Sequence, residues 1–137
     1  MKQTLFLILV LFAANASFAQ TQADYEKVMA RFQKFYNAGL SDSIRAMFSD
    51  TWGTTPEKRA RLWRGGEDLL DTYGPITSMK YLGYDGQDMD PDVKIFKVVC
   101  TKSTHAIGLS LDKKNRLLTF RFHTTSKAIE ELMNNAK

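Results

Sequence analysis

The chain has 137 residues, a formal net charge of +4 and one cysteine, and 44% of its residues are hydrophobic. This length suits one domain with a single core and leaves no room for a second. The small excess of positive charge is too weak to indicate a nucleic-acid partner. A lone cysteine excludes an internal disulfide, so we expect stability to come from burial of apolar side chains.

The first nineteen residues have the pattern of an export signal. Lys2 precedes an unbroken apolar run over residues 5–14, and Ser17 and Ala19 place small residues before a cleavage site. The apolar run is too short to cross a bilayer core of roughly 30 Å. We therefore expect cleavage after Ala19, a mature domain of residues 20–137, and no transmembrane segment after cleavage. Because no cysteine near this site could accept a lipid, we expect a periplasmic or secreted protein.

Two helices are predicted at the start of the mature domain. Thr21 can cap the first, in which apolar residues recur at the i, i+3, i+4 spacing of one helix face. Gly39 is placed to end this helix, as a C-terminal glycine commonly does. Ser41 begins a second, shorter helix. Its apolar stripe consists of Ile44, Met47 and Phe48.

A third helix is predicted from Thr55 to about Tyr73. Threonine is a good cap, and Pro56 has a preset φ that suits the first helical position. The pair Gly65-Gly66 interrupts the pattern and is expected to kink or split the helix. The helix also carries a cluster of basic residues among acidic neighbours, which we interpret as a solvated face. The cluster consists of Lys58, Arg59, Arg61 and Arg64.

Strand periodicity replaces helical periodicity after Gly74-Pro75. The expected strands span residues 76–84, 93–102, 105–111 and 118–123. The second has apolar residues at both odd and even positions, and this predicts a central strand that is covered on both faces. Ser126 can cap a final amphipathic helix that carries Ile129, Leu132 and Met133. The order of helices first and strands second predicts an α+β fold.

Several stretches carry a family resemblance: Phe32-x-x-Phe35-Tyr36-Asn37-Ala38-Gly39-x-Ser41 followed by Met47-Phe48-Ser49, then Tyr73-Gly74-Pro75-Ile76, and the hairpin from Leu109 to Leu117. They resemble an exported bacterial domain of unknown function, found alone or ahead of serine-hydrolase and peptidase domains, in the nuclear transport factor 2-like (SnoaL-like) superfamily. The resemblance implies N-terminal helices packed on a curved, mainly antiparallel four-stranded sheet, with a short C-terminal helix. That superfamily contains isomerases, dehydratases, hydrolases and noncatalytic binding modules, so no catalytic residues are carried over.

His105 and His123 are the two histidines, and they fall on the last two predicted strands. A common apolar face for these strands requires Leu109 to lie opposite Leu118. In the same register His105 lies opposite Phe122, on the apolar face. His123 then lies on the polar face, which excludes a shared metal site. The sequence also lacks the ligand spacings of zinc sites, and we expect neither a metal nor a cofactor.

Two further features have structural interpretations. The acidic stretch of residues 85–92 resembles a calcium loop in its spaced carboxylates, but it lacks the late glutamate of an EF-hand. We interpret it as a solvated turn. Cys100 lies in an apolar run and is expected to be a buried, unreactive thiol.

The residues best suited to bind a ligand are aromatic side chains and one histidine. Large aromatic groups bury much area and retain a polar group that can orient a ligand, although core packing is the alternative. His105 is the residue on the apolar face whose charge can change near neutral pH. The predicted ligand-binding residues are Tyr36, Trp52, Trp63, Tyr81 and His105.

The sequence favours an exported, noncatalytic module that binds a small apolar or amphipathic ligand, or that interacts with another protein. The protein partner would be a second copy, giving a homodimer, or another envelope protein. The alternative is a small pocket enzyme of the isomerase, dehydratase or hydrolase type, with His105 as general acid or base. A purely structural subunit is a third possibility, and it predicts a stable dimer.

Overall fold

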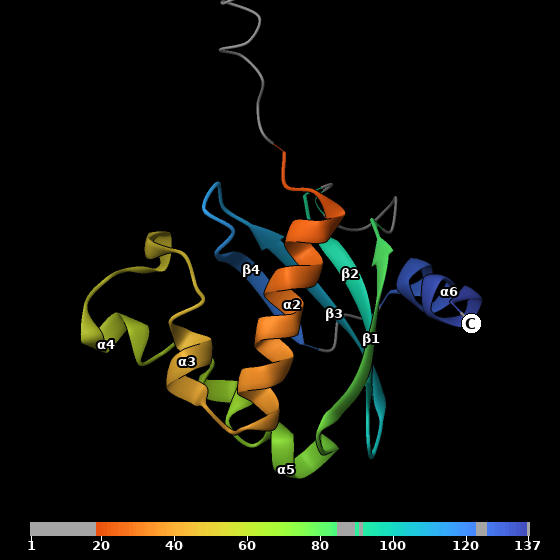
Figure 1. Cartoon of the computed structure of the whole chain (residues 1–137), viewed down its shortest axis with the longest axis horizontal. Coiled ribbons are helices and arrows are strands. Elements are labelled where there is room, and N and C mark those ends of the chain that lie inside the picture. The colour runs from red at the N-terminus through yellow and green to blue at the C-terminus, as the bar shows by residue number, and fades with distance from the viewer. Residues whose placement is uncertain (1–18, 85–89, 91, 123–125, 137) are drawn as a thin grey trace, which may run out of the picture.

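The computed structural model describes residues 19–84, 90, 92–122 and 126–136 (Figure 1). The predicted signal, apart from its last residue, lies outside these residues, as do His123 and most of the acidic stretch 85–92. The long helix α2 lies along one face of a sheet, and the C-terminal helix α6 lies on the other side (Figure 1). The two layers of helix therefore enclose the sheet between them.

The sheet has four antiparallel strands in the order of the chain. They are β1 (Ile76–Gly83), β2 (Lys94–Cys100), β3 (Thr104–Leu111) and β4 (Leu117–Phe122), each hydrogen-bonded to the next. Helix α6 spans Lys127–Asn135. The predicted α+β fold, with helices before a four-stranded antiparallel sheet and a short helix after it, is confirmed.

Helix α2 (Gln22–Asn37) begins and ends where the sequence predicts. The Asp24 backbone N–H donates to Thr21 Oγ1 at 3.3 Å, and the Thr21 N–H donates to an Asp24 carboxylate oxygen at 2.8 Å, which completes a capping box. After the helix, Gly39 has a φ of +66°, the left-handed conformation that a C-terminal glycine adopts easily. The shorter α3 (Ser41–Arg45) follows.

The long helix predicted from residue 55 to residue 73 is wrong. The Thr55 hydroxyl does cap a helix, accepting from the Lys58 N–H at 3.4 Å, but that helix, α4 (Pro56–Arg59), has a single turn. A 3-10 turn η2 (Arg64–Gly66) and a short α5 (Leu69–Tyr73) follow. Trp63 has a φ of +62°, which no right-handed helix accommodates. The chain is therefore split just before the predicted glycine pair.

Strand β2 is covered on both faces, as predicted. Phe96 and Val98 face α2 and belong to the main core. Ile95 points the other way and packs with Ile129 of α6 in a second, smaller core. Cys100 is buried at the end of the strand, and burial raises the pKa of its thiol, as expected for an unreactive cysteine.

The pairing of β3 with β4 differs from the predicted register by two residues. Leu109 pairs with Phe120 and not with Leu118, and Phe122 pairs with Ile107 and not with the histidine two residues before it. One residue of this shift comes from the connection, because Leu111 pairs with Leu117 and leaves five residues between them, where the predicted register leaves four. The other comes from a β-bulge at the start of β4, which leaves Leu118 as an extra residue that is 37% exposed. Alternation within the strand does not indicate this bulge. The predicted inner face is correct for Phe120 and Phe122 but wrong for Leu118, because the bulge exposes Leu118 and Leu117 is buried instead.

Candidate functional site

A groove of about 320 Å³ opens between strand β4 and the split helical segment that precedes the sheet. This size is at the lower end of the range of small-molecule pockets. Most of its walls are apolar, and we call it the aromatic groove. Its apolar residues are Phe48, Trp52, Leu62, Trp63, Leu69, Phe120 and Phe122.

Trp63 forms the wall of the aromatic groove that lies nearest the core. Its indole meets Phe32 of α2 edge-on, with ring centroids 5.4 Å apart, and meets Phe120 of β4 in the same way at 5.7 Å. These are favourable geometries for aromatic pairs. The backbone of Trp63 is left-handed where the sequence predicts a continuous helix, and its ring lies against Phe120 of the sheet. The break in the helix therefore creates this wall.

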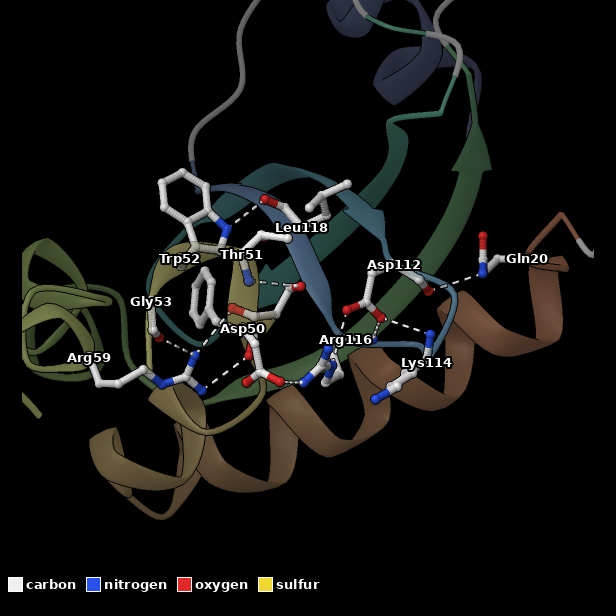
Figure 2. Close-up of polar contacts among 12 residues, drawn as sticks. Gln20, Asp50, Thr51, Trp52, Gly53, Arg59, Asp112, Lys114, Arg116 and Leu118 are labelled. Carbon is white, nitrogen blue, oxygen red and sulfur yellow. Dashed lines mark hydrogen bonds and ion pairs between the residues drawn. The ribbon is translucent and has the colours of Figure 1, made fainter. Parts of the chain in front are cut away.

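Trp52 stands at the rim of the groove, on the short turn η1 (Asp50–Trp52). Its indole N–H donates to the carbonyl oxygen of Leu118 at 2.7 Å (Figure 2), while the residue remains 48% exposed. The bulged residue of β4 thus provides the anchor for an otherwise exposed aromatic ring. An exposed tryptophan held at one polar atom is available to cover a ligand.

Arg59 fixes the loop that carries Trp52. Within the described residues, its guanidinium donates only to backbone carbonyls, as Figure 2 shows in part. The acceptors are Arg45 and Phe48 at 3.1 Å, Ser49 at 3.2 Å and Gly53 at 3.4 Å. The interpretation of the basic cluster as a wholly solvated face is therefore wrong for Arg59. Because α4 ends at this residue, its side chain folds back over the preceding loop.

Arg116 joins the same loop to the β3–β4 hairpin. It bonds Asp50 at 2.6 Å and Asp112 at 3.0 Å (Figure 2). The hydrogen bond from Arg116 is the main cause that lowers the pKa of Asp50. Burial acts to raise the pKa of Asp112, but hydrogen bonds from the Arg116 and Lys114 N–H groups and from nearby side chains outweigh it and lower that pKa. Both carboxylates are thus held in their charged form.

His105 lies in the core beside the aromatic groove and does not line it. The residue is 8% exposed, and its ring centroid lies 4.2 Å from that of Tyr73 and 5.4 Å from that of Phe122. Its Nε2 lies 2.6 Å from Ser103 Oγ. The predicted position on the apolar face is confirmed, and the ring is enclosed by aromatic neighbours.

Tyr36 and Tyr81 also lie away from the lining of the groove. Tyr36 is buried, its hydroxyl donates to the Gly74 carbonyl at 3.2 Å, and burial raises its pKa to about 12. Tyr81 packs edge-on against Phe96 at 5.3 Å. Of the five residues predicted to bind a ligand, the structure brings Trp52 and Trp63 together and places the other three in the core or beside it.

Sequence reasoning missed the phenylalanines of β4 and the arginines of the groove. Phe120 and Phe122 share the inner parity of their strand, which could have indicated that they face the same space as the core aromatics. The sequence pattern places Arg61 and Arg64 on a helix face, whereas their position at the groove depends on the split at Trp63. The glycine pair predicts a break in this helix, but it does not predict the left-handed turn at Trp63 that brings both arginines to the groove.

A second hollow of about 340 Å³ is bordered by residues on the opposite face of β3 and β4. Its wall includes Ser110 and Thr119, whose hydroxyl oxygens lie 2.8 Å apart and satisfy each other. Asp92 and Arg121 also border it, so charges of both signs are present. This mixed lining gives no single ligand chemistry, and the aromatic groove remains the stronger candidate.

The part of the chain that the structure describes contains no group of three or more His, Cys, Asp or Glu side chains placed to hold a metal ion. Within the same residues, no helix has both the length and the apolar character needed to cross a membrane. Comparison with protein-family models, curated proteins and solved structures finds no match to this chain. The resemblance to the nuclear transport factor 2-like superfamily therefore stays a prediction.

Proposed function

We propose that the protein is an exported, noncatalytic module that binds a small apolar or amphipathic molecule in the aromatic groove. The observation that carries this proposal is the convergence of Trp52, Trp63, Phe120 and Phe122 on one solvent-accessible hollow. A ligand there gains by removing apolar surface from water and by stacking on indole rings. Export rests on the pattern of the first nineteen residues.

Rigidity of the walls supports binding by a preformed site. Trp63 is packed against the core, and the loop of Trp52 is held by Arg59 and by the pair of Arg116 with Asp50. A site whose side chains are already ordered loses little conformational entropy when a ligand enters. A small molecule can then bind without a large rearrangement of the domain.

The alternative is a pocket enzyme in which His105 transfers a proton. One observation favours it, because Nε2 of His105 lies 2.6 Å from the Ser103 hydroxyl and a histidine can activate such a hydroxyl. Against it, the ring is buried under Tyr73 and Phe122 and does not line the groove. A substrate in the groove would not reach the ring, and the noncatalytic proposal requires no such contact.

The test uses the full-length precursor expressed with its own signal and purified from the periplasm of a bacterial host. Native mass spectrometry reports its oligomeric mass and any retained molecule, and titration with the neutral fluorophore N-phenyl-1-naphthylamine reports apolar binding. We expect Trp52→Ala to weaken probe binding at least about fivefold, because an exposed indole at the rim is lost. Leu40→Ala, at another exposed apolar residue away from the groove, should leave binding unchanged.

Two results would count against this function. A protein that binds no probe and carries no small molecule but forms a dimer would instead be a protein-interaction module. Probe binding that is equal in Trp52→Ala and Leu40→Ala would place the site outside the aromatic groove. His105→Gln should retain probe binding, since the histidine does not line the site.

A further inference from the structure

The charged side chains that line the aromatic groove all have the same sign. They are Arg61 and Arg64, which lie in and beside the turn that carries Trp63, and both are exposed. Among the described residues, neither has a hydrogen bond or ion pair through its side chain. Two guanidinium groups without protein partners therefore flank an apolar cavity.

Two of the acidic residues near this segment form ion pairs with arginines outside it. Glu67 forms its ion pair with Arg45 of α3, and Asp50 forms its pair with Arg116 of the hairpin. Neither carboxylate lines the groove. The positive potential of the two arginines is therefore not cancelled at the groove by these two carboxylates.

We propose that the aromatic groove selects small molecules with an apolar, preferably aromatic, body and one anionic head group. This inference rests on the proposed function and names its ligand class. The body lies against Trp63 and Phe120, and the head lies at the rim, where Arg61 and Arg64 bind it. The planar guanidinium donates two parallel hydrogen bonds to a carboxylate or a sulfonate, and no such fit exists for a cationic head. The basic cluster that the sequence suggested was a solvated surface thus contributes a specificity element.

The expected contribution of the arginines is modest because both are exposed to solvent. Exposed ion pairs are weakened by water and by salt. Together the two arginines should strengthen the binding of an anionic ligand by about tenfold at low ionic strength. Higher salt should reduce this preference, whereas it should leave the binding of a neutral ligand intact.

A matched pair of fluorophores separates the head group from the body. The two are 1-anilinonaphthalene-8-sulfonate and N-phenyl-1-naphthylamine, which share one aromatic skeleton and differ by the sulfonate. We expect the double variant Arg61→Gln with Arg64→Gln to lower the affinity for the sulfonate probe by about tenfold. Its affinity for the neutral probe should change by less than about twofold. A carboxylate head is tested by competition with the anion of 1-naphthaleneacetic acid and with its neutral amide. In the parent protein the anion should displace the neutral probe better than the amide, and in the groove variant the two should compete equally.

The control removes the same charge from another surface. Arg31→Gln with Lys34→Gln takes two positive charges from exposed positions of α2 that do not line the groove. This control should bind both probes as the parent protein does. An equal loss of sulfonate binding in the control and in the groove variant would overturn the proposal, because net charge would then be the cause.

The two proposals fail in different ways. If the groove variant binds both probes like the parent, the head-group inference is wrong while apolar binding stands. If the parent binds neither probe, the proposed function itself is wrong. Circular dichroism spectra of these variants should match, since the side chains exchanged have no hydrogen-bond or ion-pair partners among the residues that the structure describes.

Discussion

Gly66 is the position at which one methyl group can change the shape of the aromatic groove. A Cβ placed there would lie 2.3 Å from Cε2 of Trp63 and within 2.5 Å of two other atoms of the indole. Gly66 is buried, so the methyl group has no solvent to turn into. Its neighbour Gly65 offers a matched control, because a Cβ there meets no atom within 4 Å. The Gly66→Ala substitution therefore forces the indole of Trp63 to move, whereas Gly65→Ala requires no side chain to move.

The loss of stability expected in Gly66→Ala follows from the contacts that Trp63 makes. Overpacking of a fitted site costs about 1–3 kcal/mol. Moving the indole also weakens its edge-on contacts with Phe32 and Phe120, each worth about 0.5–1.5 kcal/mol. Replacing glycine with alanine recovers about 0.4–1 kcal/mol by restricting the unfolded chain. We expect Gly66→Ala to lower the free energy of unfolding by about 1–3 kcal/mol, and Gly65→Ala to leave it unchanged or raise it slightly.

Two measurements check this prediction together. Urea unfolding followed by circular dichroism gives the free energy of unfolding, and titration with N-phenyl-1-naphthylamine gives the affinity of the groove. Gly66→Ala should lose both stability and probe affinity, whereas Gly65→Ala should keep both. If the two variants behave alike, the indole of Trp63 does not pack on Gly66, and our description of the groove wall is refuted.

Three other predictions concern the supports of the groove and the core. Arg59→Ala should lower the free energy of unfolding by about 2 kcal/mol, at about 0.5 kcal/mol for each of its four carbonyl acceptors, and Arg59→Lys should recover only part of this in urea unfolding. The pKa of Asp112 is held below its ordinary 3.8, because hydrogen bonds, including that from Arg116, outweigh burial. The folded state therefore binds fewer protons than the unfolded state, and this stabilisation is complete above about pH 4 and is lost as the pH falls further. Urea midpoints at about pH 7 and about pH 3 should differ less in Asp112→Asn than in the parent. Cys100, whose pKa burial raises, should react with Ellman's reagent only after unfolding, and rapid reaction of the native protein would contradict its burial.

Much of the fold could be predicted because its signals are local. The capping box of Thr21 and Asp24 depends on residues three apart, and the inner parity of β3 and β4 depends on alternation within each strand. The bulge at Leu118 could not be predicted, because it is accompanied by contacts with distant residues. The Leu118 carbonyl accepts a hydrogen bond from the Trp52 indole, and the neighbouring Leu117 forms a parallel β-bridge with Phe48.

The candidate site could be predicted only in part, because residue type does not tell which aromatic side chains the core will use. Tyr36 and Tyr81 have the same chemistry as a ligand-binding tyrosine, but one is buried on α2 and the other packs on β2. Trp52 and Trp63 remain at the groove because the chain turns there. Proximity to other aromatics in three dimensions decides the role of each, and spacing in the sequence does not carry that information.

The unusual backbone of Trp63 links the core of the domain to its proposed binding site. A bulky residue in the left-handed region costs about 1–2 kcal/mol. The edge-on contacts of its indole with Phe32 and Phe120 are of a size that offsets this cost. The conformation is thus stabilised by contacts from α2 and from β4, both of which lie outside the split segment. A ligand in the groove meets a ring that the core has already ordered, so changes in core packing at Phe32 should alter affinity without any contact with the ligand.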